Sequence, residues 1–197
     1  MPNYDVIYRN GTVVNQDGRT LCDIGVTAGR VAFIGDLSQA SAGEVVDCTG
    51  LHILPGVIDS QVHFREPGPT HKEDLQTGSL AAVMGGVTAV FEMPNTDPLT
   101  TSEAALADKV KRATDRMHCD FAFWVGGTHD NAKDVAELER LPGAAGIKVF
   151  MGSSTGSLLV EDDAGVASIL KNTRRRSAFH SEDEFRLRDR KGERIEG

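Results

Sequence analysis

The chain has 197 residues, and its 21 Lys and Arg against 29 Asp and Glu give a formal net charge of −8. This acidic balance argues against a nucleic-acid partner or an acidic membrane surface, and no apolar run approaches the roughly 18 residues that cross a bilayer. The three cysteines are odd in number and form no Cys-x-x-Cys pair, so we expect reduced thiols in a cytoplasmic protein.

Residues 1–53 are typical of short strands, and we expect them to form a small N-terminal β-sandwich layer. Asn10-Gly11 lies between two β-branched runs, and Gln16-Asp17-Gly18 follows the second run. Asn-Gly and Asp-Gly in such positions are strong hairpin signals. An independent binding module is the less favoured alternative, because the last of these strands leads directly into the strand after Pro55.

Residues 54–197 alternate between strand and helix patterns. The expected strands recur at roughly 30-residue intervals, the length of one βα unit, and cover 57–62, 88–93, 120–125, 147–150 and 177–179. The expected helices cover 75–84, about 100–116 with a Thr100/Glu103 capping box, 132–141 and 162–172. This alternation predicts an α/β fold with a parallel sheet and helices outside it.

A complete (β/α)₈ barrel of the TIM type takes roughly 250 residues, whereas about 145 follow the β-layer. We therefore expect an incomplete barrel of about five strands, from a fragment of a longer protein or a truncated gene product. A shorter, complete α/β domain is the alternative. The last stretch, 182–194, is rich in mixed charges and poor in apolar residues.

The segment from Pro55 to Gly68 is the most informative part of the chain. Strand side chains alternate with period two, which is expected to place Asp59, Gln61, His63 and Arg65 on one side. Polar groups on an enclosed strand face must be paired, bound to a metal or available to a ligand.

Further candidates lie at the ends of later strands, where barrel enzymes carry their catalytic groups. Asn95 follows the second strand, in a segment that is also typical of a turn. Lys148 lies within an apolar strand, where a lysine is costly unless it is neutralised, paired or able to reach solvent. His180 ends the fifth strand beside a carboxylate-rich loop that could orient its ring, and a merely solvated strand-end histidine is the alternative. His129, after the third strand, is assigned no role.

Four motifs together give the chain a family resemblance. They are Gln61-Val62-His63-Phe64-Arg65-Glu66-Pro67-Gly68, Met93-Pro94-Asn95, Lys148 in its apolar strand, and His180-Ser181-Glu182-Asp183-Glu184. The chain resembles the dihydroorotase branch of the amidohydrolase superfamily, which also includes allantoinases and hydantoinases. Its members usually show Asp-x-His-x-His-x-Arg-Glu-Pro-Gly in the first barrel strand, and here Gln61 stands at the first His.

The resemblance implies a dihydroorotase-type, metal-dependent hydrolase that interconverts dihydroorotate and carbamoyl aspartate in pyrimidine biosynthesis. His63, Lys148 as a carbamate, and His180 would bind one or two Zn²⁺ ions. Arg65 and Asn95 would hold the carboxylate of the substrate. The family's catalytic aspartate would lie beyond residue 197, so we expect no catalytic residue within this chain and no turnover by it alone.

Two alternatives to this function remain open. Gln61 is a poorer zinc ligand than imidazole, which supports a non-catalytic dihydroorotase-like partner in an assembly with a carbamoyltransferase or with copies of itself. An allantoinase or hydantoinase is the other alternative. Arg65 disfavours it, because allantoin and hydantoin carry no carboxylate.

Overall fold

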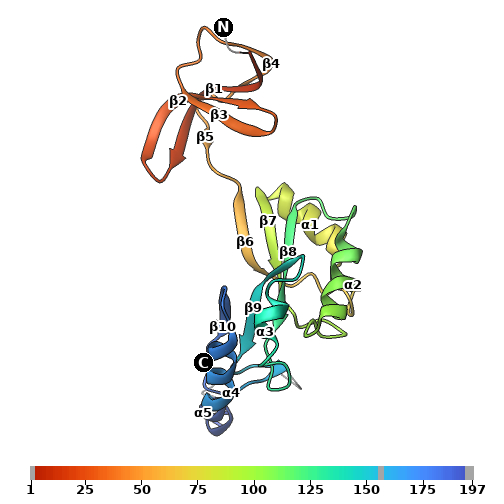
Figure 1. Cartoon of the computed structure of the whole chain (residues 1–197). Helices are drawn as coiled ribbons and strands as arrows, with labels where there is room; N and C mark the ends of the chain where they lie inside the picture. The colour runs from red at the N-terminus through yellow and green to blue at the C-terminus, as the bar shows by residue number, and fades with distance from the viewer. Residues whose placement is uncertain (1–2, 155–157, 194–197) are drawn as a thin grey trace. The chain divides into compact units, whose positions relative to one another are not determined.

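The computed structural model describes residues 3–154 and 158–193 (Figure 1). The chain divides into two compact units, Met1–Gly56 and Val57–Gly197. Within the described ranges, no helix has both the length and the apolar character that a bilayer crossing requires.

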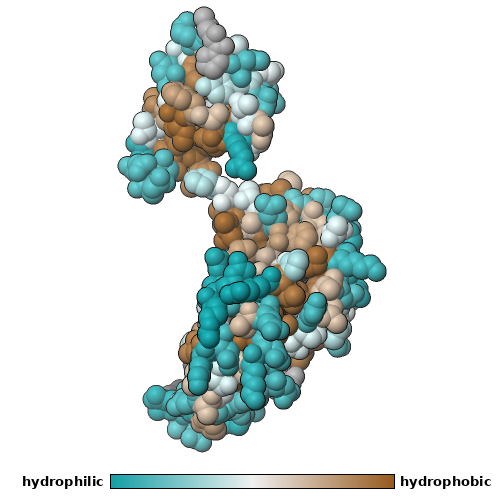
Figure 2. Space-filling view, viewed as in Figure 1, coloured by the Kyte–Doolittle hydropathy of each residue, from teal (hydrophilic) through white to brown (hydrophobic). Residues whose placement is uncertain are grey.

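The first unit is a single mixed sheet of five strands. Its order is β3-β2-β1-β4, and β5 also pairs with β1. The strands are β1 (Asn3–Asn15), β2 (Gly18–Thr27), β3 (Arg30–Gly35), β4 (Ser41–Asp47) and β5 (His52–Ile53). The sheet buries a small core of Tyr4, Ile7 and Leu37. Apolar side chains also gather at the surface of this unit (Figure 2). Leu21 and Val31, both in this unit, are 74% and 61% exposed. β4 and β5 were not expected from the sequence.

The expected hairpin at Asn10-Gly11 is wrong, because β1 runs through both residues as one strand with a bulge. The pairing of β1 with β2 shifts register between Tyr8 and Gly11, and Asn10 has a φ of 62°. The Asn10 N–H donates to Asp23 Oδ1 at 2.9 Å, and a side chain at position 11 would collide with Ile53. A left-handed residue followed by glycine is therefore used here as a bulge. The turn at Gln16-Asp17 is confirmed, since Asn15 pairs with Gly18.

The second unit contains a five-stranded parallel sheet in the order β10-β9-β8-β7-β6. Its strands are β6 (Val57–Val62), β7 (Val87–Glu92), β8 (Asp120–Gly126), β9 (Ala144–Phe150) and β10 (Ser177–His180). Strands that follow one another in sequence are neighbours in the sheet, as in a (β/α)₈ barrel. The predicted fold, an incomplete barrel preceded by a β-layer, is confirmed.

Helices α1 (Leu75–Met84), α2 (Glu103–Ala113), α3 (Val135–Leu138) and α4 (Asp163–Asn172) contribute buried side chains to one face of this sheet. A further short helix, α5 (Glu184–Asp189), buries no residue. Leu75, Val90, Leu106, Phe123 and Ile169 are buried between helices and strands. This packing fixes the outer face and leaves the inner face to carry polar groups at the strand ends.

Two helix predictions need correction, and one helix was not predicted. The cap of α2 is Ser102, whose hydroxyl accepts from the Ala105 N–H at 3.3 Å, and not Thr100. Thr100 is buried and its hydroxyl lies 3.2 Å from that of Thr96. The third helix is shorter than expected. The charged stretch after His180 contains the short helix α5, because Asp183 caps it and Glu184 pairs with Arg188 one turn later.

Candidate active site

His63 follows β6 and meets Asn95, which follows the neighbouring strand β7. The two side chains are joined by a hydrogen bond of 2.9 Å between His63 Nδ1 and Asn95 Oδ1. With Asn95 oriented in this way, Nδ1 donates its proton and Nε2 keeps the lone pair that a metal requires. Burial, followed by the positive charge of Arg65, lowers the pKa of His63. The neutral imidazole is therefore favoured at physiological pH.

Arg65 lies outside the strand that was expected to carry it. β6 ends at Val62, and Arg65 has a φ of 64°, in the left-handed region. The period-two argument therefore does not extend to Arg65, and the prediction of one continuous strand face is wrong at this point. The guanidinium is half-buried and close enough to affect His63 electrostatically.

Lys148 lies inside β9 and is only 3% exposed. Its register partners are Gly126 of β8 and Ala178 of β10, whose small size leaves room for the long side chain. The Lys148 Nζ lies 4.9 Å from the centre of the Phe150 ring. Burial lowers the pKa of Lys148. The solvent-reaching alternative is thus excluded, and the structure favours a lysine that is more easily deprotonated than a surface one.

His180 ends β10 directly beside Phe150, its register partner on β9. The two rings are stacked, with centres 5.9 Å apart and planes inclined by 24°. His180 Nε2 lies 2.8 Å from Glu182 Oε2, which leaves Nδ1 as the available ligand nitrogen. Lys148 and His180 therefore contact the same aromatic ring from neighbouring strands.

Gln61 is exposed on β6, which is one of the two edge strands of the parallel sheet as the structure describes it. Its backbone N–H donates to Asp59 Oδ1 at 3.0 Å. Three of the four expected ligand positions thus hold groups suited to zinc, namely two imidazoles and a buried amine. The fourth holds an amide, so the residues fit a metal centre with one weak position.

A family model for the amidohydrolase family, Amidohydro_1, matches residues 52–176. The chain belongs to the amidohydrolase family. It is 39% identical over 151 residues to an allantoinase of Desulfitobacterium hafniense, covering 76% of this chain and 33% of the relative. It is 34% identical over 183 residues to a dihydroorotase of Methanosarcina acetivorans, covering 91% and 39%. The chain therefore spans only about a third to two-fifths of the length of these relatives.

A solved L-hydantoinase from Arthrobacter aurescens shares the fold with this amidohydrolase chain. The TM-score is 0.86 at 30% sequence identity, over 96% of this chain and 43% of the hydantoinase chain. The relatives thus carry three different enzyme names, and the family relationship does not choose among them.

Sequence reasoning gave no role to a second group of potential ligands near the strand ends. His129, Glu161 and Asp162 offer ligand atoms that all lie within 4.8 Å of one another. His129 Nε2 lies 3.1 Å from Asp162 Oδ2. Beside them is a hollow of about 570 Å³ whose lining includes Glu182 and Asp183. The separation of His129 from the two carboxylates in the chain hid this group from sequence analysis.

The buried ion pair between Glu92 and Lys109 was also missed. Lys109 on α2 is 0% exposed, Glu92 on β7 is 1% exposed, and their charged atoms are in direct contact. Burial raises the pKa of Glu92 to about 7, although Lys109 opposes this rise. Lys109 Nζ also donates to the Met93 carbonyl at 3.0 Å, two residues before Asn95. The sequence did contain a signal for a buried lysine, because Lys109 follows Leu106 by three residues and so lies on the apolar face of the helix.

Proposed function

We propose that the whole protein carrying this amidohydrolase chain is a dihydroorotase-type hydrolase that opens and closes the cyclic amide of dihydroorotate. The observation that carries the proposal is Lys148, which is almost fully buried and shares the Phe150 ring with His180. A buried amine with a lowered pKa is suited to reaction with CO₂, in which the Nζ–C bond forms and one proton leaves. The product is a carbamate with two oxygen ligands.

In this proposal His63 and His180 complete the metal ligands with imidazole nitrogens. The bound Zn²⁺ would polarise the amide carbonyl and lower the pKa of a water molecule. Asn95 holds His63 in the tautomer that leaves Nε2 available. Each of these roles uses a group that lies at the end of a strand or within one.

The choice of dihydroorotate depends on Arg65 and Asn95. Arg65 offers a planar fork of donors that matches a carboxylate. Asn95 has its oxygen engaged by His63, so its amide N–H groups remain to donate to the same carboxylate. Both residues flank His63, which brings the carboxylate site next to the proposed metal ligands.

A ring-opening assay of the whole protein with dihydroorotate, allantoin and hydantoin tests the proposal. We expect turnover of dihydroorotate. Turnover of allantoin alone would overturn the substrate, and would agree with the names of several relatives. A folded protein with no turnover of any of the three would instead support the non-catalytic assembly partner, which Gln61 favours.

Replacing Gln61 with histidine is expected to tighten zinc binding by at least about tenfold, because imidazole is a far better zinc ligand than an amide oxygen. The measurement is competition with a chelator of known affinity, combined with the metal content per chain. Gln61→Asn is the matched control and should bind zinc like the wild type. Two tightly held zinc ions in the wild type would contradict the idea that Gln61 weakens the centre.

A further inference from the structure

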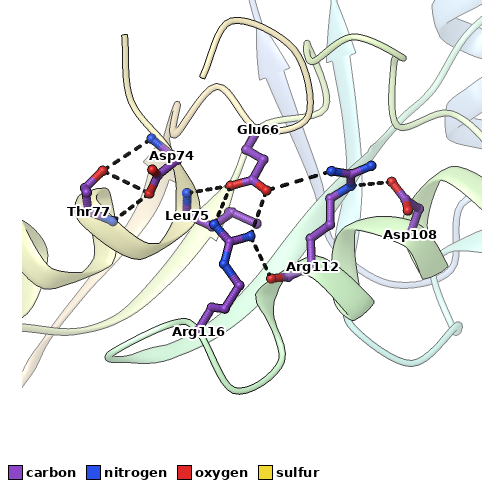
Figure 3. Close-up of polar contacts among 7 residues, drawn as sticks. All are labelled: Glu66, Asp74, Leu75, Thr77, Asp108, Arg112 and Arg116. Atoms are coloured by element: carbon purple, nitrogen blue, oxygen red, sulfur yellow. Dashed lines mark hydrogen bonds and ion pairs between the residues drawn. The ribbon is translucent and has the colours of Figure 1, made fainter. Parts of the chain in front are cut away.

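Glu66 connects the segment after β6 to two helices (Figure 3). Its side chain is only 7% exposed. Glu66 Oε2 accepts from the N–H of Leu75, the first residue of α1, at 3.1 Å. Arg116, just beyond α2, donates to both carboxylate oxygens at 2.7 and 3.1 Å. A bidentate pair of this kind fixes direction as well as distance.

Glu66 remains ionised in this position. Burial acts to raise its pKa, but hydrogen bonds from Arg116 and from the Leu75 N–H outweigh burial and hold the pKa below its usual value. The N–H groups in the first turn of a helix have no partner within the helix and favour a negative charge. The carboxylate thus satisfies the start of α1 and the Arg116 guanidinium together.

The residue before Glu66 is Arg65, whose backbone is in a conformation that side chains with a Cβ adopt rarely. Its φ of 64° costs free energy and persists only where the surroundings impose it. On the other side of Arg65, Phe64 is buried against α1 at Gly78, where even a methyl group would collide with the Phe64 ring. Both neighbours of Arg65 are therefore fixed, one by packing and one by the ion pair.

We propose that Glu66 is a positioning residue that holds Arg65 in the orientation in which its guanidinium binds a carboxylate-bearing substrate. This inference rests on the proposed function, since it assigns Glu66 an effect on the carboxylate site and not on the reacting atoms. Loss of the pair with Arg116 releases the backbone restraint at Arg65. The ligands of the proposed metal centre keep their own contacts with Asn95 and Phe150.

Kinetics of the whole protein test the proposal through Glu66→Gln and Arg116→Met. We expect the KM for dihydroorotate to rise at least about tenfold while kcat stays within about twofold, because binding of a remote carboxylate is lost equally from ground and transition states. Arg116→Lys keeps the charge without the planar fork, so its KM should be intermediate. Zinc content should equal that of the wild type.

Asp74→Ala is the control for a merely structural effect. Asp74 caps the same helix through the Thr77 N–H at 2.8 Å, so its loss weakens the start of α1 while the hydrogen bonds to Glu66 from Arg116 and from the Leu75 N–H remain. We expect a lower Tm and an unchanged KM. A KM increase in Asp74→Ala equal to that in Glu66→Gln, or an unchanged KM in Glu66→Gln, would overturn the inference.

Failure of the proposed function gives a different result. If the wild type turns over none of the three cyclic amides, calorimetry with dihydroorotate measures the carboxylate site directly. Binding that Arg65→Met abolishes and Glu66→Gln weakens at least about tenfold supports the inference. Equal binding by the wild type and Glu66→Gln, or no binding by the wild type, overturns it.

The acid stability of the protein should also depend on Glu66. Its folded-state pKa is lower than the ordinary value of 4.5, so its contribution to stability is fully present above pH 4.5 and is lost as the pH falls through the folded-state pKa. The free energy of unfolding of the wild type should therefore approach that of Glu66→Gln as the pH falls below 4.5. Urea unfolding at a series of pH values measures this difference. A constant gap between the two proteins down to pH 3 would contradict it.

Discussion

Replacement of Lys109 with methionine is expected to lower the free energy of unfolding by about 3–5 kcal/mol. The Lys109–Glu92 pair is almost completely inaccessible to solvent, so the substitution leaves a buried carboxylate without its partner. It also removes the donor to the Met93 carbonyl. Urea unfolding at constant pH measures the loss, since the midpoint shifts while the slope stays constant.

The double variant Lys109→Met/Glu92→Leu separates the ion pair from packing. Apolar residues of similar volume often replace a buried ion pair at little cost, so the double variant should regain most of the lost stability. Lys111→Met, on the exposed side of the same helix, should lie within about 0.5 kcal/mol of the wild type. A double variant as unstable as Lys109→Met alone would show that the charge left on Glu92 is not the cause.

Replacement of Lys148 with alanine is expected to lower kcat of the whole protein for dihydroorotate by about 10³-fold or more. The reason lies in the proposed carbamate, which only an amine at this position can form. Elemental analysis should show fewer zinc ions per chain than in the wild type. The fold should persist, because the register neighbours of Lys148 are Gly126 and Ala178 and the backbone pairing of β9 with β8 and β10 does not depend on the lysine side chain.

Two variants make the Lys148 result specific. Lys148→Glu places a carboxylate where the carbamate oxygens are proposed, so it should keep more zinc and more activity than Lys148→Ala. Lys171→Ala removes an exposed lysine from α4 and should behave like the wild type. Wild-type kcat and zinc content in Lys148→Ala would exclude the carbamate.

The sequence predicted the regular elements of the second unit well. The βα pattern marked β6 and α1 with their observed bounds, because apolar runs and the glycines after Met84 are local signals. The prediction of a turn at Asn10-Gly11 failed because the contact that decides the local structure is not local. The carboxylate that stabilises the bulge belongs to Asp23, 13 residues away, and no local pattern reports it.

The candidate site divides in the same way. His63, Lys148 and His180 were found from strand ends and from a lysine in an apolar run. The contact of both Lys148 and His180 with the Phe150 ring depends on the register of β9 and β10, which the sequence does not give. The partner of Glu66 could be identified only from the packing of α2, since Arg116 lies 50 residues further along the chain. Contacts of this length are set by topology and not by local sequence.

Because Arg65 and Glu66 are adjacent in the chain, the segment between Val62 and Glu66 should tolerate no insertion or deletion. Inserting or deleting one residue before Glu66 would move an arginine or a proline toward the Arg116 guanidinium and the start of α1, where only an anion is stabilised. Gene variants should therefore accept insertions and deletions after Gly68, on the exposed way to α1, far more readily than between Val62 and Glu66. An insertion before Glu66 would keep both Arg65 and Glu66 in the chain, and would still remove the restraint that the Glu66–Arg116 pair places on the proposed carboxylate site.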